Sequence, residues 1–208
     1  MKLADYEQKK ELAVFDKDFY APPSARMRDG GEPTEAFDVK ACVCFLRRAI
    51  RKAAEKYHMK ETDATRIALE NGICSLFQFP YVEDLNAIWN EVSDIPGGDR
   101  YLDSLESGSF NFKDDRKARL NRRVKSQTLA SCGGFSKMVG LNLSDVIQLA
   151  LMAGLLKAKE IPAHYREMMF DHLQRFLAWL QDRFERAKQI KKWAMEDAKK
   201  KKKGTILN

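Results

Sequence analysis

The chain has 208 residues, of which 44% are hydrophobic and 32% are charged, and its formal net charge is +7. This composition is typical of a globular protein and excludes a wholly disordered chain or a collagen-like repeat. No apolar stretch approaches the ~20 residues of a membrane helix, and Asp5 and Glu7 lie where a secretory signal has its apolar core. We therefore expect a cytoplasmic protein without a membrane partner, whose four cysteines are thiols.

The positive charge is unevenly distributed along the chain. Lys and Arg are dense in residues 113–125 and 188–203 and in excess over residues 39–82, whereas residues 83–106 are strongly acidic. A phosphate backbone responds to the local density of positive charge, so this pattern favours a polyanionic partner. A solubilising surface with a basic tail accounts for the same charges, and charge alone does not separate the two interpretations.

Turn-forming residues divide the chain. Residues 1–36 contain Pro22-Pro23 and Gly30-Gly31, and we expect an N-terminal arm that is helical only over residues 3–15. Residues 93–112 contain Pro96-Gly97-Gly98-Asp99, a composition typical of a linker. Two ordered segments, residues 37–92 and 113–160, lie on either side of this linker.

The two ordered segments resemble each other. Residues 62–73 align without gaps on residues 144–155 at a constant offset of 82, and both begin with a hydroxyl residue followed by Asp. Apolar residues at helical spacing predict a helix in each, and a second helical pattern precedes each one, over residues 47–59 and 126–141. This self-similarity indicates an internal duplication.

A strand-like run precedes each pair of helices. The first covers residues 37–45, and the second, residues 119–125, is far more basic, with Leu120 and Val124 as its inward residues. A single copy of ~40 residues would leave its strand unpaired and its apolar face uncovered. We therefore expect the two strands to pair antiparallel and the four helices to share one core. The predicted fold is mainly α with one short two-stranded antiparallel ribbon.

This order of elements resembles the ribbon-helix-helix family of the Arc and Met repressors. The resemblance is carried by the second helices, which contain Ile67-Ala68-Leu69-Glu70-Asn71-Gly72 and the run from Val146 to Leu155, and it covers roughly residues 37–76 and 118–157. Two copies in one chain are similar to the tandem members, such as the TraY-like proteins of plasmid conjugation. The resemblance implies a tandem pseudo-dimer whose ribbon enters the major groove of double-stranded DNA. It implies a cytoplasmic, nucleoid-associated transcriptional regulator or conjugation accessory factor.

The resemblance also implies which residues contact DNA. Outward residues of the ribbon contact base edges, and amides at the start of each second helix bind phosphate. In the second strand Asn121, Arg123 and Lys125 would point outward, and Arg122 would point inward and reach the ribbon edge or mark a shifted register. The implied DNA-binding residues are Asn121, Arg123, Lys125, Arg119, Arg122, Lys40, Thr62 and Ser144.

The first strand offers less for base recognition. The gap-free offset would turn Val39, Ala41 and Val43 outward, whereas the opposite register presents Lys40, Cys42 and Cys44. We favour the second register because it keeps the apolar residues inside, although it requires a one-residue difference between the copies.

Two features depart from the family pattern. Asp63 and Asp145 are expected beside the phosphate-binding amides of Thr62 and Ser144, where a second anion is unfavourable. Gly133-Gly134 lies inside a predicted helix, and since each Gly costs on the order of 1 kcal/mol relative to Ala, a kink or break is expected there.

Residues 161–203 are predicted to form one long helix with Pro162 in its first turn. A tail over residues 204–208 follows it. The helix carries a sustained apolar stripe that must be covered by the tandem core or by self-association through residues 162–194. Lys199 to Lys203 form a basic end that suits phosphate contact or simple solubility.

Other kinds of site have weaker support. Cys42 and Cys44, with Cys74 and His58 elsewhere, suggest zinc, but their spacing is not characteristic and thiols are common packing residues. The pair His164 and His172 has no nearby carboxylate pattern and suits surface or core packing. The chain has no P-loop, dinucleotide-binding turn or nucleophile elbow, so we expect neither an enzyme nor a cofactor.

Two alternatives remain open at this point. Residues 135–146 also match a helix-turn-helix with Gly140 in the turn, which would require a helix or arm at residues 119–125 instead of a strand. The chain is alternatively a helical interaction or scaffold protein that acts through its C-terminal helix.

Overall fold

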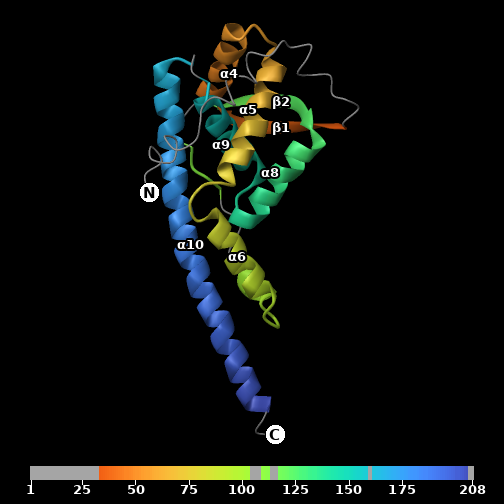
Figure 1. Cartoon of the computed structure of the whole chain (residues 1–208), viewed down its shortest axis with the longest axis vertical. Helices are drawn as coiled ribbons and strands as arrows, with labels where there is room; N and C mark the ends of the chain where they lie inside the picture. Colours follow the sequence, from red (N-terminus) through yellow and green to blue (C-terminus); the bar gives the residue numbers. More distant parts are fainter. Residues whose placement is uncertain (1–32, 104–108, 113–116, 159–160, 206–208) are drawn as a thin grey trace.

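A computed structural model describes residues 33–103, 109–112, 117–158 and 161–205. The expected helix at residues 3–15 lies outside the described residues. The elements in chain order are β1 (Thr34–Val43), α4 (Cys44–Lys56), α5 (Glu61–Leu76), α6 (Val82–Ser93), α7 (Asp99–Asp103), β2 (Lys117–Lys125), α8 (Ser126–Val139), α9 (Leu143–Leu156) and α10 (Ala163–Thr205) (Figure 1). The order strand, helix, helix therefore occurs twice, and the expected mainly helical fold with a small antiparallel sheet is confirmed.

The two strands form an antiparallel ribbon. Asp38 lies opposite Asn121 and Val39 lies opposite Leu120. The predicted antiparallel pairing of the two strand-like runs is therefore confirmed. Side chains alternate between the two faces of a strand. Leu120 and Val124 are buried as predicted, together with Val39, and the inner face of the ribbon therefore belongs to the core.

A β-bulge interrupts β1. Between the pairs Val39–Leu120 and Cys42–Ala118, β1 advances by three residues while β2 advances by two. The register that we favoured for the first strand requires a one-residue difference between the two copies, and the extra residue of the bulge provides it. It also corrects the prediction for Cys42, which is fully buried beside buried Val43 because the bulge shifts the alternation. Cys44 is not a strand residue but begins α4.

The centre of the molecule is the contact between α5 and α9. A Cβ atom on Gly72 would lie 1.6 Å from the carbonyl oxygen of Ala150, and one on Gly154 would lie 1.9 Å from that of Ala68. The two contacts are reciprocal, since Ala68 and Gly72 correspond to Ala150 and Gly154 at the offset of the repeat. Glycine is required at both positions because the two backbones approach so closely.

α8 is an unbroken helix, so the helix break that was one expected outcome at Gly133-Gly134 does not occur. Its buried side chains Cys132, Phe135 and Val139 hold it against the core. This packing outweighs the low helix propensity of two glycines, since most helical stability in proteins comes from tertiary contacts.

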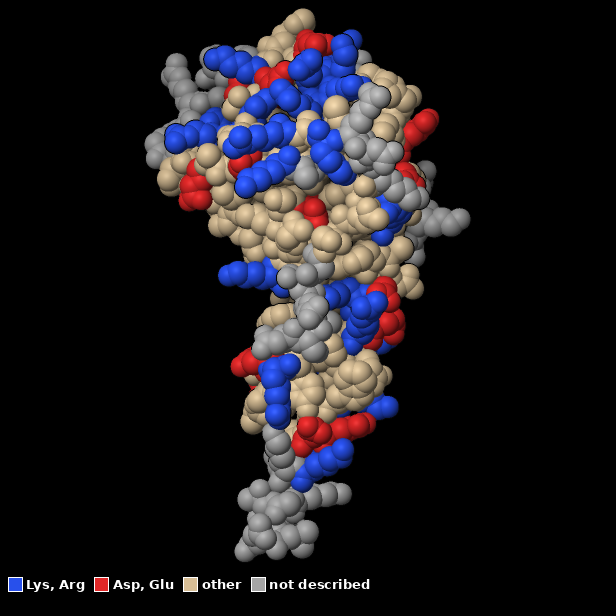
Figure 2. All heavy atoms as spheres, turned by 180° about the vertical axis from the view of Figure 1, so that it is seen from behind, with Lys and Arg blue, Asp and Glu red and all other residues tan. Residues whose placement is uncertain are grey.

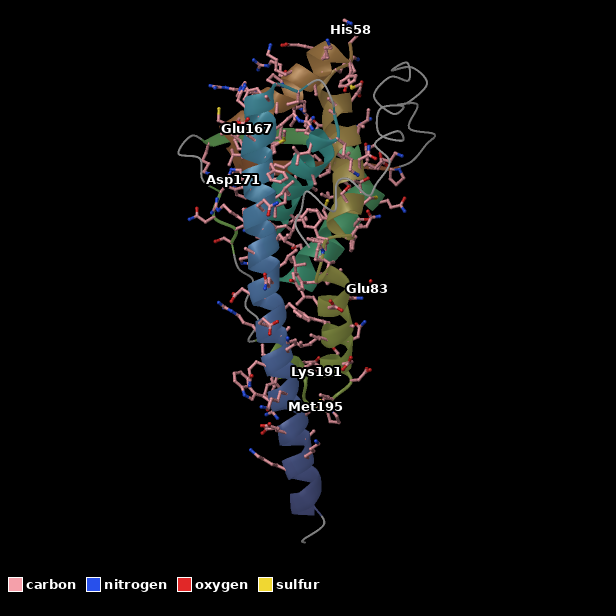
Figure 3. All side chains as sticks on the ribbon, turned by 60° about the vertical axis from the view of Figure 1, so that its left-hand side comes forward. His58, Glu83, Glu167, Asp171, Lys191 and Met195 are labelled. Carbon is pink, nitrogen blue, oxygen red and sulfur yellow. The ribbon has the colours of Figure 1, made fainter. Side chains whose placement is uncertain are left out.

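α10 extends along the molecule and continues beside α6 (Figure 1). Lys191 of α10, labelled in Figure 3, forms an ion pair with Glu91 of α6. The buried residues of the apolar stripe are Met169, Leu173, Phe176, Leu180, Ala187, Ile190 and Ala194. The stripe is covered by the chain itself, so burying it needs no self-association.

The segment interpreted as a linker contributes to the core. It contains α7, and Leu102, Phe110 and Phe112 are buried. In the described part of the chain, none of the helices combines the length and the apolar character that crossing a membrane would require.

Candidate nucleic-acid interface

The outer face of the ribbon is polar and exposed. On β2, Arg119, Asn121 and Arg123 are exposed and alternate with the buried residues of the inner face. On β1, Lys40 is also exposed. Figure 2 shows many Lys and Arg side chains gathered over the half of the molecule that holds the ribbon and α4 in Figure 1.

Arg119 is held by an acid of the opposite strand. Its Nε and Nη2 donate to the two carboxylate oxygens of Asp38 at 2.9 and 2.7 Å. These hydrogen bonds lower the pKa of Asp38, so the carboxylate remains charged at the centre of the outer face. Asp38 was not among the predicted site residues, because only the pairing of the strands brings it to Arg119. The guanidinium of Arg119 is therefore already engaged.

Arg122 points inward and reaches the ribbon edge, in agreement with one of the two predicted outcomes. Its Nη2 donates to Glu61 Oε2 of α5 at 2.8 Å, and its Nη1 donates to the carbonyl oxygen of Asn121 at 2.8 Å. Arg122 thus anchors β2 to α5, and its donors are not on the outer face.

Asn121 and Arg123 keep their side chains available. Within the described part of the chain, no hydrogen bond or ion pair engages either side chain. The backbone carbonyl of Arg123 accepts a hydrogen bond from Arg66 Nε at 2.9 Å, which ties β2 to α5. Lys125, predicted to be outward, is only partly exposed and pairs with Glu70 at 3.2 Å.

The start of α5 is surrounded by charge. Glu61 begins the helix and lies between two arginines, because its other oxygen, Oε1, is 3.2 Å from Arg51 Nε. Thr62, the predicted phosphate-binding residue, is the next residue and is partly buried. The arrangement of one glutamate between two arginines had no signal in the sequence, since the three residues come from three elements.

The start of α9 differs from this arrangement. Asn142 Oδ1 accepts a hydrogen bond from the amide of Asp145 at 2.9 Å, and Ser144 is partly buried. The carboxylate of Asp145 accepts hydrogen bonds from the Phe110 amide and Asn142 Nδ2, both at 2.7 Å. Asp145 is buried, and burial raises its pKa. Asp145 lies in the first turn of α9 as expected, but its carboxylate is turned into the core, where it binds the segment before β2.

The described residues contain no candidate metal site. No group of three His, Cys, Asp or Glu side chains there is arranged to hold a metal ion. His58 is exposed at one end of the molecule (Figure 3), whereas Cys42 is buried. His172 is buried and stacks on Phe45 with ring centroids 5.5 Å apart, as expected of a packing residue.

The chain was compared with family models, with curated proteins and with solved structures, and none of the three comparisons found a match.

Proposed function

We propose that the protein binds double-stranded DNA sequence-specifically by inserting the β1–β2 ribbon into the major groove. The observation that carries this proposal is the ribbon itself: Asn121 and Arg123 are exposed on one face, and the other face is buried in the core. A two-stranded ribbon fits a groove about 12 Å wide. Arginine suits a bidentate contact with guanine, and asparagine one with adenine.

We also propose that the two strand-helix-helix units act as a tandem ribbon-helix-helix pseudo-dimer. The reciprocal contacts of Gly72 with Ala150 and of Gly154 with Ala68 support this arrangement. In a two-fold interface, residue i contacts j and j contacts i, and the two copies reproduce that pattern within one chain.

In this proposal the mechanism is non-covalent. Bases are recognised by Asn121 and Arg123, while Lys40, Lys125 and the amides of Thr62 and Ser144 contribute phosphate contacts that do not depend on sequence. Arg119 contributes when it leaves Asp38. The role that fits is a regulator of transcription or an accessory factor at a transfer site of a mobile element, in the cytoplasm with the nucleoid.

The helix-turn-helix alternative has less support. Gly140 does lie in the turn between α8 and α9, with φ 72°. That alternative requires a helix or arm at residues 119–125, however, and these residues are a strand paired with β1. The scaffold alternative loses its main argument because the apolar stripe of α10 is already covered.

The test is a selection of preferred sites from random duplexes, followed by titration of the variants at fixed salt. Arg123→Ala should weaken binding to the preferred site by roughly ten- to a hundredfold, as expected for one bidentate base contact of about 1–3 kcal/mol, and affect random DNA much less. Lys40→Ala is the matched control, an exposed base on the other strand, and should have the smaller effect on discrimination. A chain that selects no preferred site, or equal losses on both DNAs for Arg123→Ala, would contradict the proposal.

A further inference from the structure

The exposed side of α4 carries a row of basic residues that base recognition by the ribbon does not use. Leu46, Ile50 and Ala53 are buried on the inner side of this helix. The basic residues on the opposite, exposed side are Arg47, Arg48, Arg51 and Lys52. Arg51 and Lys52 have acidic partners, Glu61 and Glu55, whereas Arg47 and Arg48 have no ion pair within the described part of the chain.

This basic side of α4 borders the ribbon. Glu61 connects the two, since Arg51 of α4 lies 3.2 Å from one of its oxygens and Arg122 of β2 lies 2.8 Å from the other. Arg51 and Arg122 therefore share one carboxylate. The Lys and Arg side chains in Figure 2 gather over the same half of the molecule. A polyanion seated on the ribbon would thus meet the positive charge of α4 beside it.

The corresponding helix of the second copy lacks this charge. The first residues of α4 and α8, Cys44 and Ser126, are separated by the offset of the repeat. The residues of α8 that correspond to Arg47, Arg48, Arg51 and Lys52 are Leu129, Ala130, Gly133 and Gly134. The two helices keep matching buried positions, for example Ile50 and Cys132, so their difference lies in the outward charge and not in the packing.

We infer that α4 binds the phosphate backbone of the same DNA duplex on one flank of the ribbon, and that α8 makes no corresponding contact. This inference rests on the proposed function. Duplex DNA presents one negative charge per about 1.7 Å, and phosphate contacts fix position without reading sequence. The first copy then supplies backbone contacts through α4, while the second copy supplies base contacts through β2.

The experiment compares Arg47→Gln, Arg48→Gln and Lys137→Gln in the full chain. All three substitutions remove one positive charge from an exposed helical position, two from α4 and one from α8, and Gln has nearly the helix propensity of Lys and Arg. Affinity for the preferred site and for random duplex is measured between 50 and 200 mM salt. Each α4 substitution should reduce the salt slope by about 0.9 on both DNAs, and Lys137→Gln should leave it unchanged.

The outcomes separate this inference from the proposed function. Equal slope changes for the α4 variants and Lys137→Gln would overturn the inference, because net charge would then suffice. Unchanged slopes for Arg47→Gln and Arg48→Gln would also overturn it, even when the wild type selects a preferred site. If the α4 variants lose slope while no site is selected, the backbone surface stands and base recognition by the ribbon fails. Circular dichroism of each variant verifies that the helices are intact.

Discussion

The two strand-helix-helix copies agree in their buried residues and differ in their exposed ones. Gly72 and Gly154 make equivalent contacts across the α5–α9 interface, and Ile50 and Cys132 occupy matching buried positions. In contrast, β2 exposes Asn121 and Arg123, where β1 has Asp38 at the centre of the same face. The packing of a shared core constrains only residues that contact it, so the outward faces of the copies can diverge.

In the proposed function, this difference has a consequence for DNA recognition. A symmetric dimer presents the same contacts twice and prefers a palindromic site, because the two-fold axis of the protein is mirrored in the DNA. Unequal strands and unequal first helices instead predict an asymmetric site.

The strongest destabilisation is expected at the α5–α9 crossing, where the two copies make equivalent contacts. Gly72→Ala places a methyl group 1.6 Å from the carbonyl oxygen of Ala150, so the helices must separate. We expect a loss of about 3 kcal/mol in the free energy of unfolding, at the upper end of overpacking costs. The matched control is Gly133→Ala, whose added methyl group meets nothing within 4 Å. This substitution should stabilise the protein by about 1 kcal/mol, because alanine has the higher helix propensity. Urea unfolding followed by circular dichroism measures both, and equal effects would contradict the close crossing.

The second prediction concerns Asp145, which has Asp63 as its counterpart in the first copy. Asp145→Ala leaves the Phe110 amide without its acceptor and should cost about 1–3 kcal/mol, whereas Asp63→Ala, a partly buried position, should cost less. Urea unfolding of the two variants compares them. A larger loss for Asp63→Ala would contradict the assigned roles.

The pH dependence of stability follows from the burial of Asp145. Burial raises its pKa in the folded state above the usual 3.8, so its charge disfavours folding above the raised value. This penalty disappears as the pH falls from the raised pKa toward 3.8, because the folded state then binds the proton more tightly. Wild type should therefore gain stability relative to Asp145→Asn over that interval, as measured by urea unfolding at a series of pH values. A constant difference would show that folding does not raise the pKa of Asp145.

Another prediction makes the unequal first helices alike. Ala130→Arg with Gly134→Lys gives α8 the charge that α4 has at the equivalent positions, and Gly134 has open space for a side chain. The salt slope of DNA binding should steepen by up to about 0.9 for each added base. The control Ala130→Gln with Gly134→Gln has the same change in helix propensity without charge and should leave the slope unchanged.

The smallest expected effect is at Asp38. Asp38→Asn removes the acid from the outer face and releases Arg119, so DNA affinity should rise by about two- to fivefold, the scale of one exposed ion pair. Because Arg119 lowers the pKa of Asp38, the carboxylate stays charged when the pH falls from 7 to 5. Mild acid should therefore not reproduce the gain through this residue. An affinity that falls in Asp38→Asn would mean that the pair orients the ribbon for binding.

The order strand, helix, helix in both copies, and most of the buried faces of these elements, could be predicted from the sequence alone. Alternation in β2 predicted that Leu120 and Val124 are inside, and the offset of the repeat paired the two copies, because local periodicity decides which side of an element is apolar. The long helix after Pro162 followed from the absence of Gly and Pro over many turns.

The partners of the polar groups, in contrast, depend on the tertiary structure. The sequence did not indicate the bulge that buries Cys42. It also did not indicate three contacts between different elements: Asp38 with Arg119, Asp145 with the Phe110 amide, and Glu61 with both Arg51 and Arg122. A polar group takes the partner that folding brings within hydrogen-bond distance, and periodicity along the chain does not specify that partner. The same reason separates Arg119, which is engaged, from Arg123, which is available, although the sequence presents both as outward arginines of one strand.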